Sequence, residues 1–168
     1  MKVYLLLAAM AMALTILLTP AVRWACLRFG IVPALRGRDL QKTPIPRLGG
    51  IAMTISLIVT MLVASRIPYM APLFAGTIPW AVMAGAGGMC ILGIIDDIIE
   101  LDWMAKLGGQ VLIAGGMAFG GVQLASFPIF GITLGSSRLS LFISVLFIVG
   151  IMNAVNFIDG LDGLASGM

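Results

Sequence analysis

The feature that most constrains this chain is a series of long apolar segments that contain no charged residue. Hydrophobic residues make up 61% of its 168 residues and charged residues only 10%, against about half and about a quarter in an ordinary soluble domain. A helix built on such a segment can cross the ~30 Å hydrocarbon core of a bilayer. The sequence therefore predicts an all-α integral membrane protein and argues against a water-soluble fold.

We expect five transmembrane helices in a single polytopic membrane domain that covers residues 1–168. They are placed at Val3–Val22, Gly50–Ala64, Ile78–Ile95, Leu107–Val122 and Leu139–Val155. The connection 123–137 mixes apolar residues with Gly and Pro, which predicts a short external hairpin between helices four and five. The alternative for the first segment is a signal peptide, although its apolar run is longer than usual and no small-residue cleavage site closes it.

All the acidic residues are predicted to lie on one face of the membrane. With five spans, the connections after the first and third helices and the tail after the fifth share a side. These segments contain Asp39, Asp96, Asp97, Glu100, Asp102, Asp159 and Asp162. Of the ten basic residues, only Lys2, Arg66 and Arg138 fall on the opposite side. The excess of Lys and Arg marks the acidic face as cytoplasmic and places the N-terminus outside.

Histidine, cysteine and glycine limit the reactions and binding sites that the sequence can support. Without histidine, proton transfer or metal binding must use carboxylates, amides or lysine. Cys26 and Cys90 show no disulfide or zinc spacing and are interpreted as small core residues. Glycines cluster in the third and fourth spans and predict close helix packing rather than a phosphate-binding loop; they are Gly85, Gly87, Gly88, Gly108, Gly109, Gly115 and Gly116.

The first polar cluster is the end of the third span, GIIDDIIELD. Asp96 and Asp97 stand side by side there, and a continuing helix would place Glu100 one turn further on. Adjacent carboxylates at a helix C-terminus repel each other and the helix dipole. We expect a positive partner: a divalent cation, a phosphate-bridging metal or the basic first loop. The alternative is a solvated interfacial cluster of acids without chemistry.

The second polar cluster is NAVNFIDGLDGLASG, at the end of the fifth span. Asn153, Asn156, Asp159 and Asp162 recur every three residues and would share a helical edge until Gly160. Amide and carboxylate oxygens are ligands suited to magnesium, and backbone amides freed by glycine can approach a phosphate. Four unpaired polar residues in an apolar setting would cost several kcal/mol, which favours a functional interpretation.

The third cluster is the first connection, RDLQKTPIPRLGG. Its prolines stiffen the chain, and Lys42 and Arg47 are natural partners of phosphate. An ordinary positive-inside loop is the alternative. Because the basic residues gather in this loop rather than over a face, a membrane or phosphate partner is favoured over nucleic acid.

These three segments, in this order and on one face, resemble the polyprenyl-phosphate N-acetylhexosamine-1-phosphate transferases of glycosyltransferase family 4. The PIPRLGG loop is more similar to the undecaprenyl-phosphate N-acetylglucosamine-1-phosphate transferases than to the phospho-N-acetylmuramoyl-pentapeptide transferases. The resemblance runs from Arg38 to the C-terminus. It implies a magnesium-dependent enzyme of the bacterial cytoplasmic membrane, with its active face cytoplasmic. In that reaction a polyprenyl phosphate attacks a UDP-sugar and UMP leaves, and a homodimer is a further expectation.

The resemblance also implies roles for individual residues. Asp96 and Asp97 match paired acids that act on the attacking lipid phosphate, and Asn156 matches an amide ligand of magnesium. The residues that match the nucleotide-sugar pocket are Lys42, Asp159, Gly160, Leu161 and Asp162.

Two departures from the family stand out. Gln41 replaces a histidine that often precedes the loop lysine and keeps only a hydrogen bond there. Family members have about ten spans and a further metal-binding aspartate beyond the point where this sequence stops. We therefore expect residues 1–168 to be an N-terminal half that is inactive alone.

Other classes remain open at this point. CDP-alcohol phosphotransferases also use aspartates at helix ends, but their signature pairs DG with an AR two residues later, whereas here DG is followed by Leu161 and Asp162. A transporter would be expected to place ionisable groups near the midplane. A non-catalytic remnant or membrane subunit is the third alternative.

Overall fold

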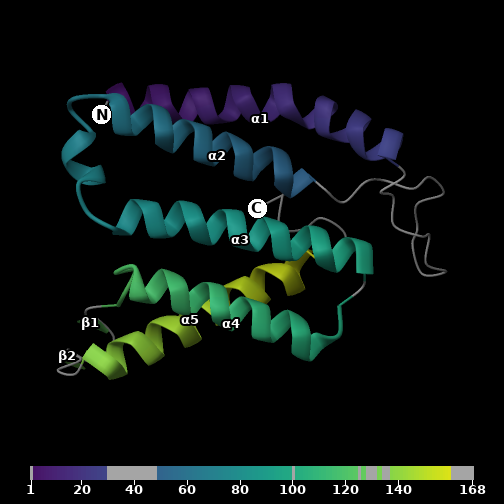
Figure 1. Cartoon of the computed structure of the whole chain (residues 1–168). Helices are drawn as coiled ribbons and strands as arrows, with labels where there is room; N and C mark the ends of the chain where they lie inside the picture. Colours follow the sequence, from purple (N-terminus) through teal and green to yellow (C-terminus); the bar gives the residue numbers. More distant parts are fainter. Residues whose placement is uncertain are drawn as a thin grey trace.

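The structure, a computed structural model, describes residues 2–29, 49–99, 101–124, 126–127, 132–133 and 137–159. Within these ranges the chain forms five α-helices, in the order of the predicted spans (Figure 1). They are α1 (Lys2–Phe29), α2 (Gly49–Arg66), α3 (Ile78–Ile99), α4 (Trp103–Phe119) and α5 (Ser137–Asp159). A short 3-10 helix, η1 (Ala71–Phe74), lies between α2 and α3. The predicted all-α fold is confirmed.

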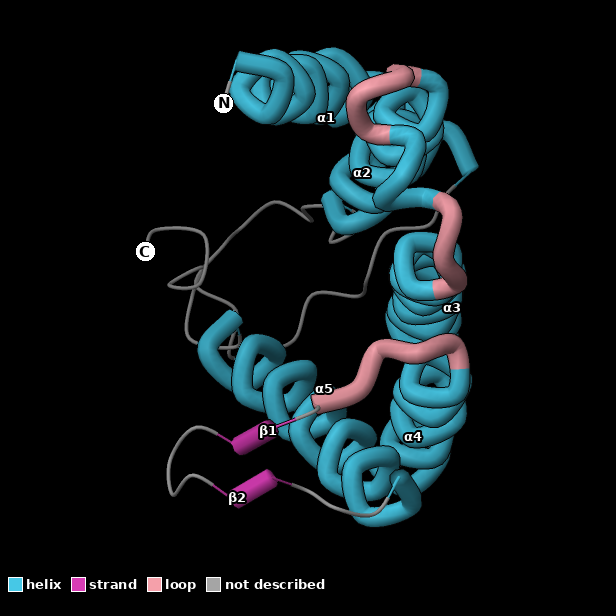
Figure 2. The backbone as a smooth tube through the Cα atoms, turned by 90° about the vertical axis from the view of Figure 1, so that its left-hand side faces the viewer, coloured by secondary structure: helices cyan, strands magenta, loops and turns pink. Residues whose placement is uncertain are grey.

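Successive helices run antiparallel, so α1, α3 and α5 point one way and α2 and α4 the other (Figure 1). Each α-helix packs against its sequence neighbours only, among the elements described. Seen along their axes, the helices therefore lie on an open arc with α1 and α5 at its two edges (Figure 2). This alternation brings the end of α3, the start of α4 and the end of α5 to one end of the bundle.

The first helix is longer than the predicted span, because it continues past Pro20 and Val22 to Phe29. A proline inside a membrane helix is tolerated where neighbouring groups satisfy the freed backbone. The added turns carry Arg28, whose guanidinium lies over the Trp24 ring, 5.1 Å from its centroid. A cation stacked on tryptophan is typical of the interfacial zone, so the extension lies at the membrane boundary.

Four of the five helices are long and apolar enough to cross a membrane: α1, α2, α3 and α5. The fourth helix, α4, has 17 residues and rises about 25 Å at 1.5 Å per residue, which is the short end of the range for a span. It packs between α3 and α5. The prediction of five helices is confirmed, and α4 is the shortest of them.

The predicted hairpin between α4 and α5 is present. Strands β1 (Ser126–Phe127) and β2 (Ile132–Thr133) pair antiparallel. The segment before β1 is tied to α5 by serines: the Leu124 amide donates to Ser144 Oγ at 2.8 Å, and Ser140 Oγ donates to the Leu124 carbonyl at 2.7 Å. These bonds place the hairpin at the end of the bundle that also holds the start of α1.

Every tryptophan and tyrosine of the chain lies near a helix end and is largely exposed. Tyr4, Tyr69 and Trp80 are at the end where the chain begins, and Trp24 and Trp103 are at the other. Aromatic residues favour the two membrane–water interfaces because their rings are amphipathic. Two bands of exposed aromatics at opposite ends of the bundle are the pattern of a membrane protein.

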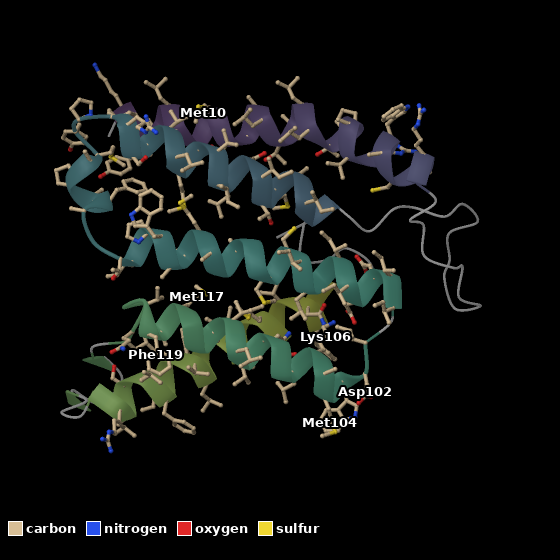
Figure 3. The ribbon with its side chains drawn as sticks, in the orientation of Figure 1. Met10, Asp102, Met104, Lys106, Met117 and Phe119 are labelled. Atoms are coloured by element: carbon tan, nitrogen blue, oxygen red, sulfur yellow. The ribbon has the colours of Figure 1, made fainter. Side chains whose placement is uncertain are left out.

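Glycines permit the close packing of α3 and α4, but only some of those predicted. A Cβ at Gly109 would lie 2.7 Å from Leu92, and one at Gly85 would collide with Met117, which points towards α3 (Figure 3). A Cβ at Gly88 would meet Ile113 at 3.4 Å. The packing role predicted for the other four glycines is wrong within the described part of the chain, because a Cβ there would meet no atom within 4 Å; they are Gly87, Gly108, Gly115 and Gly116.

Candidate functional site

The acid pair lies in the last turns of α3, and its positive partner comes from α4. Lys106 Nζ donates to Asp96 Oδ2 at 2.8 Å, with 28% of the lysine and 25% of the aspartate side chain exposed. Lys106 lies between α3 and α4 near the turn that joins them (Figure 3). Because α3 ends at Ile99 and α4 begins at Trp103, this tight turn folds the lysine back onto the acid.

The positive partner predicted for the acid pair is, for Asp96, the side chain of Lys106. The sequence analysis used this lysine only to decide which side of the membrane is cytoplasmic. The available signal was spacing, since Lys106 is the first cation after the acid pair and lies ten residues beyond Asp96. Half-buried Asp97 stands beside this ion pair. The site thus places Asp97 next in sequence to a carboxylate that is ion-paired with Lys106.

The other acids of this segment are arranged differently. Asp102 is the N-cap residue of α4 and is exposed, without a side-chain capping bond. Its carboxylate still lies at the positive end of the α4 dipole, which is a favourable position for an anion. Glu100, predicted to continue the α3 helix, lies outside the described residues.

The amide-rich motif occupies the end of α5, and its members separate into two kinds. Asn153 Nδ2 donates to Gln110 Oε1 of α4 at 2.7 Å and to the Val149 carbonyl at 2.9 Å. Asn156 is exposed and makes no hydrogen bond to another described residue. Asp159 is the last residue of α5. The Nδ2 group of Asn153 thus links α5 to α4, while the ligand role expected for the side-chain oxygens of all four members stays a prediction.

Gln110 is the second residue that sequence reasoning missed. It is only 2% exposed and is the largest fully buried side chain within the described residues. A glutamine inside an apolar span was a detectable signal, because a buried amide requires a partner. That partner, Asn153, is 43 residues away in sequence.

Several residues predicted for the site lie outside the described part of the chain. They are Asp39, Gln41, Lys42, Arg47, Gly160, Leu161 and Asp162. Their roles stay predictions. Cys26 is buried, Cys90 is half-buried and both thiols are free, as expected of small packing residues.

The side-chain oxygen atoms at this end of the bundle are of the kind that binds a hard cation. Carboxylate and amide oxygens are the protein ligands that Mg²⁺ takes, and Asn156 has an exposed amide that no described residue engages. In the described ranges, no three acidic or thiol side chains converge as a metal cluster. The described residues therefore offer individual candidate ligands and do not form a complete coordination sphere.

Comparison with known proteins agrees with this arrangement. Residues 79–168, which include both polar helix ends, match Glycosyl transferase family 4. Decaprenyl-phosphate N-acetylglucosaminephosphotransferase of Mycolicibacterium smegmatis is 36% identical over 94% of this chain and 40% of its own length. The probable undecaprenyl-phosphate N-acetylglucosaminyl 1-phosphate transferase of Bacillus subtilis is 32% identical over 91% and 41%.

A more distant group is also similar. Phospho-N-acetylmuramoyl-pentapeptide-transferase of Streptomyces avermitilis is 32% identical over 76% of this chain and 40% of its own length. No solved structure matches. The chain thus spans about 40% of the length of these curated relatives. The matched residues, the helical membrane architecture and the position of the polar clusters agree, and the chain belongs to Glycosyl transferase family 4.

Proposed function

We propose that this chain forms part of an enzyme that transfers a sugar 1-phosphate from a UDP-N-acetylhexosamine to a polyprenyl phosphate and releases UMP. The relatives named for decaprenyl and undecaprenyl phosphate support both the lipid acceptor and the N-acetylglucosamine unit. The observation that supports the proposal most is geometric. The Asp96–Lys106 pair with Asp97, and the Asn156-bearing end of α5, lie at the same end of one bundle.

The reaction joins two anions, which explains why both signs of charge are needed. An oxygen of the lipid phosphate attacks the phosphorus next to the sugar, a new P–O–P bond forms, and the bond to UMP breaks. In our proposal Asp96 and Asp97 orient the lipid phosphate, and Asp97 accepts its remaining proton where one is present. Lys106 holds Asp96 in place and lowers the negative charge that the incoming phosphate meets.

The donor side is assigned to the other two segments. Lys42, Asp159, Gly160, Leu161 and Asp162 are proposed to hold the nucleotide sugar. Asn156 is proposed as an amide ligand of Mg²⁺, which when bound would neutralise charge on the diphosphate. Asn156 suits this role because its amide is exposed and not engaged by other described residues.

We further propose that the polar end faces the bacterial cytoplasm. The predicted topology assigns seven of the ten Lys and Arg residues to this side, and the positive-inside bias supports that orientation. A UDP-sugar is also a cytoplasmic substrate. Homodimer formation belongs to the same proposal, since among the described helices α1 and α5 each contact a single helical neighbour.

The test uses the protein encoded by the complete reading frame, purified with detergent and supplied with undecaprenyl phosphate, UDP-N-acetylglucosamine and Mg²⁺. We expect UMP release that requires both substrates. Asp97→Asn should reduce turnover by at least about 100-fold, about 2.7 kcal/mol in the barrier, without changing membrane insertion. Asp102→Asn is the matched control, since this acid is exposed at the same end and should leave turnover within about twofold.

Two outcomes would contradict the proposal. One is the absence of UMP release from well-folded protein with either N-acetylglucosamine or N-acetylmuramoyl-pentapeptide donors. The other is near-normal turnover of Asp97→Asn, which would remove the acid pair from the mechanism.

A further inference from the structure

One face of α4 carries two polar side chains that reach in different directions. Lys106 bonds to Asp96 of α3, and Gln110, four residues later, bonds to Asn153 of α5. Residues four apart in a helix lie one above the other. The two cross-helix bonds are therefore separated by one turn of α4, and they tie it to both neighbours near the same end of the bundle.

Beyond Gln110, the same row of α4 carries small side chains. Ala114 and Ala118 continue the row of Gln110 along α4 and are completely buried. Small side chains let helices approach closely but resist sliding or rotation only weakly. The 2.7 Å hydrogen bond between the Gln110 and Asn153 amides is directional, so it forms at a single register of α5 against α4. It therefore supplies a resistance to sliding that the alanines do not provide.

The second hydrogen bond of Asn153 makes this restraint rigid. The same Nδ2 group also donates to the Val149 carbonyl one turn earlier on α5, so its side chain is held against its own helix. Gln110 is in turn enclosed at 2% exposure. Asn156 follows Asn153 by three residues and sits almost one turn further along α5.

We infer that Gln110 and Asn153 are positioning residues for the site, because their bond sets the register of α5 and thereby places Asn156 relative to the Asp96–Lys106 pair. Neither touches substrate in this scheme. Lys106 and Gln110 make α4 the element that holds the acid pair and the amide motif at a constant separation. The expected effect on turnover rests on the proposed transferase reaction. The register of α5 against α4 does not depend on that reaction.

The primary variants are Gln110→Met, which keeps the side-chain length but removes the amide, and Asn153→Ala, which shortens an exposed side chain of α5 and leaves the Gln110 amide oxygen without this donor. In the full-length protein each should lower kcat about tenfold, with KM for both substrates changed less than about twofold. The swapped double variant, Gln110→Asn with Asn153→Gln, preserves two facing amides and the same total length. It should recover at least half of the lost turnover.

The matched control is Ser144→Ala. Ser144 is also buried on α5 and also forms hydrogen bonds, but at the opposite end of the helix. This variant should lose thermal stability and keep kcat, so the control separates general destabilisation from loss of register.

A second readout does not depend on activity. Amide hydrogen exchange of residues 151–159 should become at least about tenfold faster in Gln110→Met and Asn153→Ala, and should stay unchanged in Ser144→Ala. If the unaltered protein releases no UMP, the proposed function fails while exchange still tests the register. Unchanged exchange together with normal kcat in both primary variants would overturn the inference and leave the proposed function standing.

Discussion

Replacing Lys106 with methionine should destabilise the bundle mainly through Asp96. Exposed ion pairs contribute about 0.2–1 kcal/mol, and removing one partner of a fully buried pair costs about 3–5 kcal/mol. The Lys106 and Asp96 side chains retain 28% and 25% exposure, so this pair lies between those limits. Its 2.8 Å contact is a charge-assisted hydrogen bond. The substitution also leaves the Asp96 carboxylate without this lysine at the negative end of the α3 dipole, which costs several tenths of a kcal/mol more.

We therefore expect Lys106→Met to lower the free energy of unfolding by about 2 kcal/mol, and Asp96→Asn by about 1 kcal/mol, since the lysine head group can turn towards water. The double variant should cost about 2 kcal/mol, which gives a coupling of about 1 kcal/mol. Unfolding in mixed micelles with increasing SDS, followed by tryptophan fluorescence, measures all three values. Arg138→Met is the control, because Arg138 is exposed at the other end and forms no ion pair with a described residue.

The reasoning would be refuted by a coupling near zero together with a cost for Lys106→Met no larger than that of Arg138→Met. Salt provides a second check. Raising ionic strength from 0.1 to 1 M shortens the Debye length from about 10 to about 3 Å, which screens exposed pairs strongly. Because this pair is three-quarters buried, most of its coupling should survive.

Three further predictions concern other parts of the chain. Gly120→Ala should lower the free energy of unfolding by about 2 kcal/mol, because the new Cβ would collide with the Ala81 side chain. Gly116→Ala should leave it unchanged or raise it by up to about 1 kcal/mol, because its new Cβ meets no atom. The same unfolding assay compares the two variants. Thr60→Val should stabilise by about 1 kcal/mol in the same assay, since Thr60 Oγ1 is buried without a partner in the described structure; a loss of stability would show that the hydroxyl is bonded. Asp159→Asn should abolish UMP release while membrane insertion, measured by protease accessibility, stays normal.

Much of the architecture follows from the sequence alone because hydropathy and charge act locally. The uncharged segments predicted five helices, and all five are present with their order intact. The end of α1 lies beyond its predicted position at Val22, since the helix continues past Arg23 to Phe29. Sidedness was also predictable, because charged residues avoid the hydrocarbon core and each helix reverses the chain. Within the described residues, Asp96, Asp97, Asp102 and Asp159 do gather at one end.

The sequence by itself thus determined the helices, the shared end of the described acids, the family resemblance and the choice of Asp96, Asp97 and Asn156 as candidates. It did not determine which side chains meet. A helix that is apolar on every side has no sequence signal for its rotation or register, so contacts between helices are decided only when they pack. Tertiary structure alone paired Lys106 with Asp96 and bonded Gln110 to Asn153. It also left Asn156 exposed while Asn153 contacts α4.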